Sequence, residues 1–339
     1  MNTKPELSIA TWKYDKDWVY SITYDEALFE LHRFVVPVHR ELCIPGHLEV
    51  VAGHMGVVRA LGESSFNGLR HMSGEELKEL MAEGWGVGNH SWSHGMVMDD
   101  PETELKKSKE TIEKATGRPC AIFTAPGSNA NLTPEVLERL PGYGYLAGMS
   151  ITDDLNYSDA DDLVWLNRVP IHESYGGYFE SAFEPYKRIR QAQERHGWIV
   201  DYCHCPLEKP LHECKDVTAA HHRERLETIV AEGGAGCWFA NPDDVVDYRY
   251  MRRHARIERG AQDEGRFRVR LDSLPDAVSR RELTFRIKGL TAPEVLSVEV
   301  DGVNSPAAAS RAGVLSFTAP VHDVTVIELR PNSPSRNPK

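Results

Sequence analysis

The 339-residue chain lacks several features that mark whole classes of protein. No apolar run approaches the ~18 residues of a membrane-spanning helix, and residues 1–8 carry no charged-then-apolar signal pattern. We therefore expect a cytoplasmic location, unless a leader has been removed. Basic residues are also in deficit, because the formal net charge is -12. This charge argues against nucleic acid or an anionic membrane as a partner.

Cysteine is sparse and shows no framework spacing, so we expect reduced thiols rather than a disulfide-stapled fold. Internal repeats and low-complexity segments are absent too. Hydrophobic residues make up 41% of the chain, which is ample for a buried core in one large domain or two domains. The six cysteines are Cys43, Cys120, Cys203, Cys205, Cys214 and Cys237.

Strand and helix patterns alternate about seven times before residue 256. Residues 18–24 alternate and are rich in β-branched and aromatic side chains, which predicts a strand. The alternation predicts a parallel sheet with crossover helices, closed or nearly closed into a barrel. The expected strands are 18–24, 47–51, 84–88, 120–123, 143–149, 163–169, 198–203 and 236–239. The expected helices are 27–42, 73–83, 102–116, 133–140, 179–196, 218–232 and 242–253.

The pattern changes after residue 256, where short strands follow one another without helices. We expect a small antiparallel β-sandwich over residues 257–332 and a disordered polar tail over 333–339. We favour two roles for this domain: it caps the barrel, or it mediates assembly. An oligomer formed through this domain is therefore one of the alternatives. The five expected strands are 266–271, 282–287, 296–300, 314–318 and 324–329.

Polar residues suited to metal chemistry follow the predicted strands. Asp25 and Glu26 end the first strand, and His204 ends a late one. His90 and His94 are four residues apart, a spacing that places both imidazoles on one face of a helical turn. Two histidines and one carboxylate can bind one metal ion and leave a position for water. The second carboxylate and the distant histidine can then serve as base and acid.

Four motifs carry a specific resemblance. Residues 23–26 (T-Y-D-E) resemble the T-F-D-D motif of NodB-type polysaccharide deacetylases, carbohydrate esterase family 4. Residues 89–94 (N-H-S-W-S-H) match that family's H-[ST]-x-x-H motif. Residues 123–127 resemble its third motif, and residues 202–204 its late L-x-H motif. The motifs occur in family order over about residues 18–250.

The resemblance implies an irregular (β/α)7 barrel that hydrolyses an N- or O-acetyl group on a carbohydrate. Asp25 would be the general base and His204 the general acid. Glu26, His90 and His94 would bind a divalent metal ion, most often Zn²⁺.

Three positions depart from the family pattern. Glu26 is one methylene longer than the usual aspartate, so the metal ion must sit farther out or the backbone must shift. Thr124 stands where the family often has an arginine that pairs with the base, so we expect Asp25 to lose a cation that keeps it ionised. Cys203 replaces a more usual apolar residue. Together the departures indicate a divergent member with an unusual substrate or impaired metal binding.

Substrate contacts are expected from two kinds of residue. Trp92 and Trp165 offer aromatic faces that can stack on a sugar ring, although a core role is open for either. Thr124 and Pro126 belong to the third motif and are expected beside the substrate.

Other interpretations of these residues stay open. The histidine pair is compatible with a helix surface, the two acids with a helix N-terminus, and His204 with a buried structural histidine. A weaker candidate for a second metal site is the group of Cys203, Cys205, Cys214, His221 and His222. Two other functions also fit: hydrolysis of a non-sugar C–N bond, as in a cyclic imide or ureide, and carbohydrate binding without catalysis.

Overall fold

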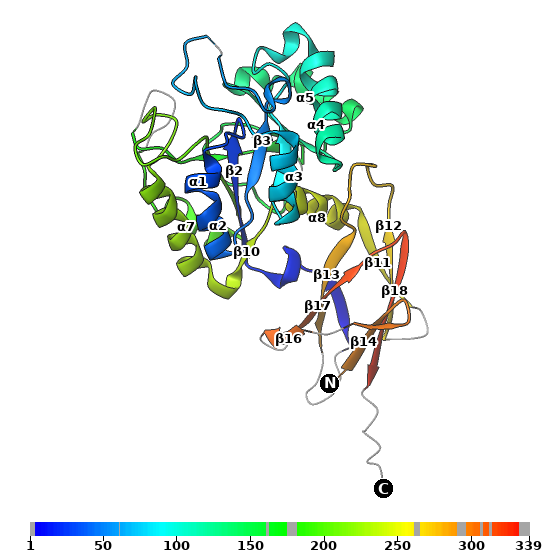
Figure 1. The fold of residues 1–339 in the computed structure, drawn as a ribbon. Coiled ribbons are helices and arrows are strands. Elements are labelled where there is room, and N and C mark those ends of the chain that lie inside the picture. The colour runs from blue at the N-terminus through cyan, green and yellow to red at the C-terminus, as the bar shows by residue number, and fades with distance from the viewer. Residues whose placement is uncertain are drawn as a thin grey trace. The chain divides into compact units, whose positions relative to one another are not determined.

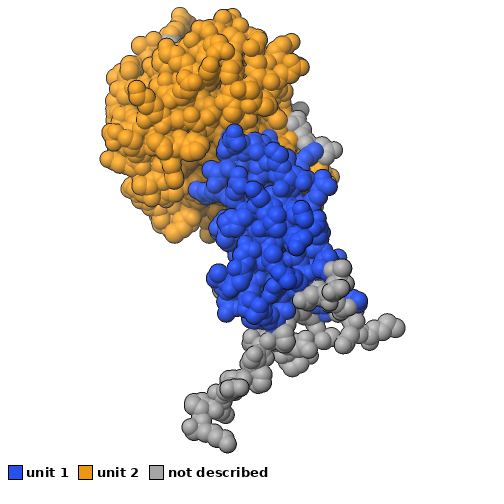
Figure 2. Space-filling model, turned by 90° about the vertical axis from the view of Figure 1, so that its right-hand side faces the viewer, with its two compact units in different colours: residues 1–17, 247–339 blue, residues 18–246 orange. Residues whose placement is uncertain are grey.

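The computed structural model describes residues 4–60, 62–160, 163–174, 182–260, 265–289, 296–305, 308–311 and 314–331. The chain forms two compact units, residues 18–246 and residues 1–17 with 247–339 (Figure 2). Within the described ranges, no helix has the length and apolar character that crossing a membrane requires. The tail predicted over residues 333–339 lies outside the described residues.

The unit of residues 18–246 is built on a parallel β-sheet, as the sequence predicts (Figure 1). Its strands are β2 (Trp18–Asp25), β3 (His47–Val50), β4 (Gly86–Asn89), β5 (Ile122–Thr124), β6 (Ala147–Met149), β7 (Trp165–Leu166), β8 (Val169–Pro170), β9 (Trp198–Cys203) and β10 (Cys237–Phe239). The strand order is β7-β6-β5-β4-β3-β2-β9-β8, and β10 pairs with the first half of β2. Every residue of the central strand β2 is buried, as expected for a parallel strand that is covered on both faces.

The sheet curls until its two ends are neighbours. Strands β7 and β8 stand at opposite ends of the strand order, yet only Asn167 and Arg168 separate them in the chain. The step from Leu166 to Val169 spans at most about 11 Å, roughly two strand spacings. The sheet is therefore an irregular barrel, and Arg168 lies fully buried at its seam.

Helices flank this sheet, with α1, α2 and α7 together on one side of β2 and α3 on the other (Figure 1). The Ser73 side chain caps α3 in a capping box with Glu76, as the sequence predicts, and α4 ends at Gly117 in the left-handed conformation. The helices are α1 (Leu31–Phe34), α2 (Val36–Leu42), α3 (Gly74–Ala82), α4 (Ser108–Thr116), α5 (Pro134–Arg139), α6 (Ile189–Arg195), α7 (Ala219–Gly233) and α8 (Pro242–His254).

Two predicted helices are shorter than expected. The helix predicted over residues 27–42 begins only at Leu31 and divides at Val35, because a tight turn follows β2. Of the helix predicted over residues 179–196, the structure describes α6 alone, and residues 179–181 lie outside the described residues.

The other unit contains two antiparallel sheets. One has the order β1-β13-β17-β16 and the other β11-β12-β18-β14-β15. The stacked rings of Phe285 and Phe317, 5.3 Å between centroids, belong to its core. Its strands are β1 (Glu6–Ile9), β11 (Ala255–Arg259), β12 (Arg266–Leu271), β13 (Glu282–Lys288), β14 (Leu296–Val300), β15 (Val303–Ser305), β16 (Ala308–Arg311), β17 (Val314–Pro320) and β18 (Val324–Pro331).

The unit boundaries differ from those expected at residues 1 and 257. Strand β1 pairs with β13, so the first residues of the chain join the β-unit rather than the barrel. Four residues of β1 show too little alternation to predict this pairing, which depends on a partner about 280 positions away.

Candidate active site

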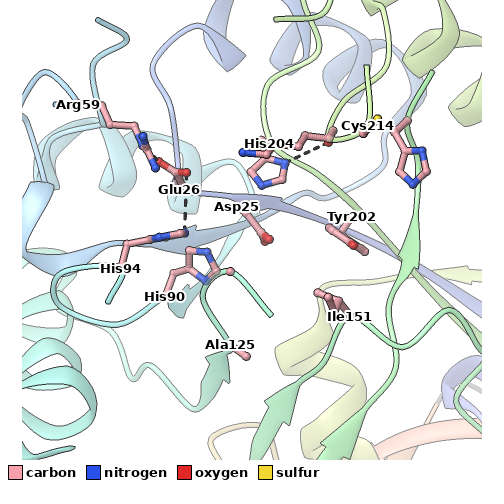
Figure 3. A pocket seen from close by; sticks show the side chains of 13 residues that line it. Asp25, Glu26, Arg59, His90, His94, Ala125, Ile151, Tyr202, His204 and Cys214 are labelled. Carbon is pink, nitrogen blue, oxygen red and sulfur yellow. Dashed lines mark hydrogen bonds and ion pairs between the residues drawn. The ribbon is translucent and has the colours of Figure 1, made fainter. Parts of the chain in front are cut away.

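The predicted site residues follow strands whose carboxyl ends meet at one edge of the sheet. Asp25 ends β2, His90 follows β4, and His204 follows β9. Because these strands are parallel, their ends converge although the sequence separates them. One pocket of about 170 Å³ is lined by Asp25, Glu26, His90, His94 and His204, with Arg59 beside them (Figure 3).

The backbone bends sharply where the two acids stand. Glu26 and Ala27 have φ values of 70° and 49°, the left-handed region that non-glycine residues seldom occupy. Two hydrogen bonds hold this turn: the His71 Nδ1–H donates to the Glu26 carbonyl at 2.7 Å, and the Met72 N–H donates to the Ala27 carbonyl at 2.9 Å. Such strain persists where the surrounding structure fixes it, often at functional sites.

The histidine segment is not the helical turn that the spacing predicted. Residues 92–95 form bends, and Ser91 and His94 have φ values of 68° and 61°. The Glu104 carboxylate accepts hydrogen bonds from the N–H groups of Trp92 and Ser93 at 2.9 and 3.0 Å. These bonds replace the helical ones, so the turn stays stable without a helix.

Both imidazoles nevertheless face each other in the pocket. The ring centroids of His90 and His94 are 5.0 Å apart, with the planes at 70°. The His90 Nδ1–H donates to the Thr124 carbonyl at 3.0 Å, which directs Nε2 away from that strand. Burial, aided by His90, lowers the pKa of His94 to about 3, so its imidazole is neutral and available as a ligand.

Asp25 has a cation that the sequence analysis did not anticipate. The Arg168 guanidinium donates to both carboxylate oxygens of Asp25, at 2.6 and 3.2 Å, and stacks 4.3 Å from the Tyr202 ring centroid. Burial alone would raise the pKa of Asp25, but Arg168, with His90 and His204, lowers it to about 2. The expectation from Thr124 is therefore wrong: Arg168, at the barrel seam, keeps this acid ionised.

Glu26 also has an arginine partner. The Arg59 Nε–H donates to Glu26 Oε2, and both side chains are almost fully buried. The other oxygen, Oε1, lies 3.9 Å from His94 Nε2. Burial would raise the pKa of Glu26, yet His94, His204 and Arg59 hold it below its ordinary value.

His204 is oriented by three contacts. Its backbone N–H donates to Asp216 Oδ1 at 2.9 Å, and its ring stacks on Phe66 at 5.0 Å between centroids. The Nδ1–H donates to the Lys215 carbonyl at 3.1 Å, which leaves Nε2 for a group in the pocket.

The four residues expected to contact substrate are placed differently. Thr124 is buried, and its hydroxyl donates to Glu49 at 2.7 Å. The Trp92 ring packs under Lys107, and the Trp165 indole donates to Asn167. Among the residues that the structure describes, the pocket wall includes Ala125 and Gly127, which flank Pro126, but none of these four. Their role in binding substrate stays a prediction.

The donor atoms suit a divalent metal ion, although they do not enclose one. Two imidazoles and one carboxylate are ligands that zinc-type ions take. Tetrahedral ligands at ~2.1 Å from zinc stand about 3.4 Å apart, somewhat closer than the 3.9 Å between Glu26 and His94. Within the described parts of the chain, no group of three His, Cys, Asp or Glu side chains is close enough to hold a metal.

A family comparison agrees with this arrangement. Residues 15–145 match the family described as polysaccharide deacetylase. Over this segment, the chain is similar to the polysaccharide deacetylase family. The matched segment contains both acids and both histidines of the pocket and ends before Arg168 and His204.

Solved structures that are similar to this chain are distant in sequence. IcaB from Ammonifex degensii has 22% identity and a TM-score of 0.36, and the match covers 44% of this chain and 66% of that one. A family 4 acetyl xylan esterase from Clostridium thermocellum, in complex with a cobalt ion, has 16% identity and a TM-score of 0.41, over 67% and 89%. Peptidoglycan deacetylase PdaC from Bacillus subtilis has 14% identity and a TM-score of 0.40, over 67% and 89%. None of the curated proteins matches the chain.

Proposed function

We propose that this chain is a metal-dependent deacetylase that removes an N- or O-acetyl group from a carbohydrate. The observation that carries the proposal is the pocket itself. An aspartate held ionised by Arg168 and a histidine with Nε2 available stand beside two facing imidazoles. Acyl hydrolysis needs a base, an acid and an electrophile in one place; Asp25 and His204 would supply the first two, and the imidazoles would be ligands for a metal ion that supplies the third.

Glu26, His90 and His94 would hold the divalent ion, with Zn²⁺ the first candidate. When bound, the ion supplies Lewis acidity toward the acetyl carbonyl and lowers the pKa of nearby water.

Asp25 accepts a proton from the attacking water, and its pairing with Arg168 ensures that it is ionised at neutral pH. The water oxygen bonds to the acetyl carbon, and the bond from that carbon to the sugar nitrogen or oxygen breaks. His204 donates its Nε2 proton to the departing amine or alkoxide. The products are acetic acid, which ionises to acetate in water, and the free sugar amine or hydroxyl, with one proton taken by Asp25 and one given by His204.

The alternative functions have lost part of their support. Hydrolysis of a cyclic imide or ureide rested on a base without an arginine, and Arg168 supplies one. Carbohydrate binding without catalysis rested on the same departures and on the β-unit.

Acetate release from N-acetylglucosamine oligomers and acetylated xylan oligomers, with added Zn²⁺ or Co²⁺, tests the proposal. Wild type is expected to release acetate, and Asp25→Asn and His90→Ala to lose at least about 10²-fold in rate. The exposed His196→Asn is a matched control that should keep full activity. Ammonia release in place of acetate, or equal rates for wild type and His90→Ala, would contradict it.

A further inference from the structure

The two oxygens of the Glu26 carboxylate face different partners. Oε1 lies on the side of His94, and Oε2 accepts the hydrogen bond from Arg59 (Figure 3). The expected ligand of a divalent cation is thus already neutralised by a cation that belongs to the chain. Arg59 is as deeply buried as the acid, at 6% and 2% exposure.

Arg59 is held in this position by the segment that carries it. Its N–H donates to the Leu69 carbonyl at 2.7 Å, and its carbonyl accepts from the Gly68 N–H at 3.0 Å. Its Nη1–H donates to Asn67 Oδ1 at 3.2 Å. Two of these hydrogen bonds hold the backbone of Arg59, and two, counting the one to Glu26, hold its guanidinium beside the pocket. A mobile arginine side chain would not have hydrogen bonds at both its backbone and its guanidinium.

Each acid of the site consequently has its own arginine. Asp25 pairs with Arg168, and Glu26 pairs with Arg59. A buried carboxylate without a partner costs several kcal/mol, so a site that relied on a metal ion alone would be unstable when empty. Here the chain's own arginines neutralise both acids. A divalent cation bound to Glu26 would meet a fixed positive charge on the opposite side of the same carboxylate, which weakens its binding.

We infer that Arg59 is the internal counter-ion of Glu26, and that it sets the affinity of the site for its divalent metal by competing with that metal for the carboxylate. The inference rests on the proposed function, because it assigns Glu26, His90 and His94 to one ion. It also accounts for the glutamate that replaces the usual aspartate. The added methylene lets one carboxylate contact Arg59 while its second oxygen stays on the side of His94.

Titration of the metal-free protein with Zn²⁺, followed by calorimetry and by metal analysis after dialysis, tests the inference without an activity readout. Arg59→Gln removes the charge and keeps a donor, so its dissociation constant for Zn²⁺ is expected to fall at least tenfold below that of wild type. Arg59→Lys keeps the charge and should stay within about threefold of wild type. Arg70→Gln is a matched control, since Arg70 lies on the same segment and pairs with Glu76 at 2.7 Å. Its affinity should not change.

Thermal unfolding gives a second readout. Metal-free Arg59→Gln should melt below wild type, because Glu26 is left buried and unpaired, and excess Zn²⁺ should raise its Tm more than that of wild type. Should the variant be unfolded without metal, excess Zn²⁺ is expected to restore the fold, and an unfolded protein in both conditions would overturn the inference.

The two proposals fail in different ways. If wild type binds Zn²⁺ and Arg59→Gln binds it no more tightly, the competition is refuted and the proposed function survives. If neither wild type nor Arg59→Gln binds any metal, the proposed metal site is refuted, and this inference is refuted with it.

Discussion

Arg168→Met is the most informative single substitution in the pocket. The methionine roughly preserves side-chain volume and removes the guanidinium that donates to Asp25 at 2.6 and 3.2 Å. It also removes the bond from Arg168 Nε to the Ser150 carbonyl at 2.9 Å. Asp25 is then a buried carboxylate that has lost its arginine partner.

The structure gives the size of the effect. Loss of one partner from a buried ion pair costs about 3–5 kcal/mol in the free energy of unfolding. The pKa of Asp25 is about 2 in the folded wild type and ~3.9 in the unfolded chain. Ionisation of Asp25 therefore stabilises the folded state above pH ~3.9, and this stabilisation is lost as the pH falls through 2. Without Arg168, burial dominates and the pKa rises, so that contribution disappears and the base is protonated at higher pH.

Two assays and one control test this reasoning. Urea unfolding at pH 7 measures the stability, and acetate release between pH 4 and 9 measures the protonation of the base. Wild type should show no loss of rate from Asp25 above pH 4, and Arg168→Met should lose rate in the acidic part of this range. Arg225→Met is the matched control, because Arg225 forms an equally buried pair with Asp201, at 2.8 and 3.1 Å, away from the pocket.

The control variant should be destabilised to a similar degree with an unchanged pH profile. An Arg168→Met protein with a wild-type pH profile, or an Arg225→Met protein with the same acidic shift, would refute the role given to Arg168.

Two further predictions concern other histidines. His47 donates to Glu49 at 2.6 Å and Asp243 at 3.1 Å, and although burial opposes protonation, these carboxylates raise its pKa to about 10. Its contribution to stability, a few kcal/mol at most, is therefore full below pH ~6.5 and lost as pH rises toward 10. Urea unfolding at pH 7 and 10 should show a smaller loss for His47→Gln than for wild type, and equal losses would contradict this. His204→Gln should lower kcat for acetate release about 10²- to 10⁴-fold with little change in KM, and a kcat within threefold of wild type would exclude it as the acid.

The barrel and the meeting of the pocket residues were predictable because they depend on local patterns. Alternating strands and helices fix a parallel sheet, and a polar residue after each strand then lies at one edge. Asp25, His90 and His204 were placed in this way without knowledge of their distances. The motif spacing pointed to the same residues independently.

The two arginines were not predictable, because each reaches its acid only through the closed fold. Arg168 stands 143 positions from Asp25, in a link between two-residue strands that looks like one continuous strand in the sequence. Arg59 lies in a loop without a motif. The sequence offers one indirect indication: two adjacent acids require counter-ions if both are buried, but the sequence does not identify the residues that supply them.

The histidine segment shows that a sequence spacing can predict the wrong local structure and still bring the right side chains together. A spacing of four suggests a helix, yet Ser91 and His94 adopt left-handed backbone, which Glu104 stabilises from the following helical turn. The two rings still meet, although by a geometry other than the one expected, and their role as metal ligands stays a prediction.

Anomalous scattering from crystals grown with Zn²⁺, recorded on both sides of the zinc absorption edge, tests the central proposal most directly. We expect one strong peak in the pocket, within about 2.3 Å of nitrogen atoms of His90 and His94 and of a Glu26 oxygen, with Asp25 and His204 on either side of its open face. A peak elsewhere in the chain, or none at saturating Zn²⁺, would contradict the proposed metal site and the chemistry derived from it.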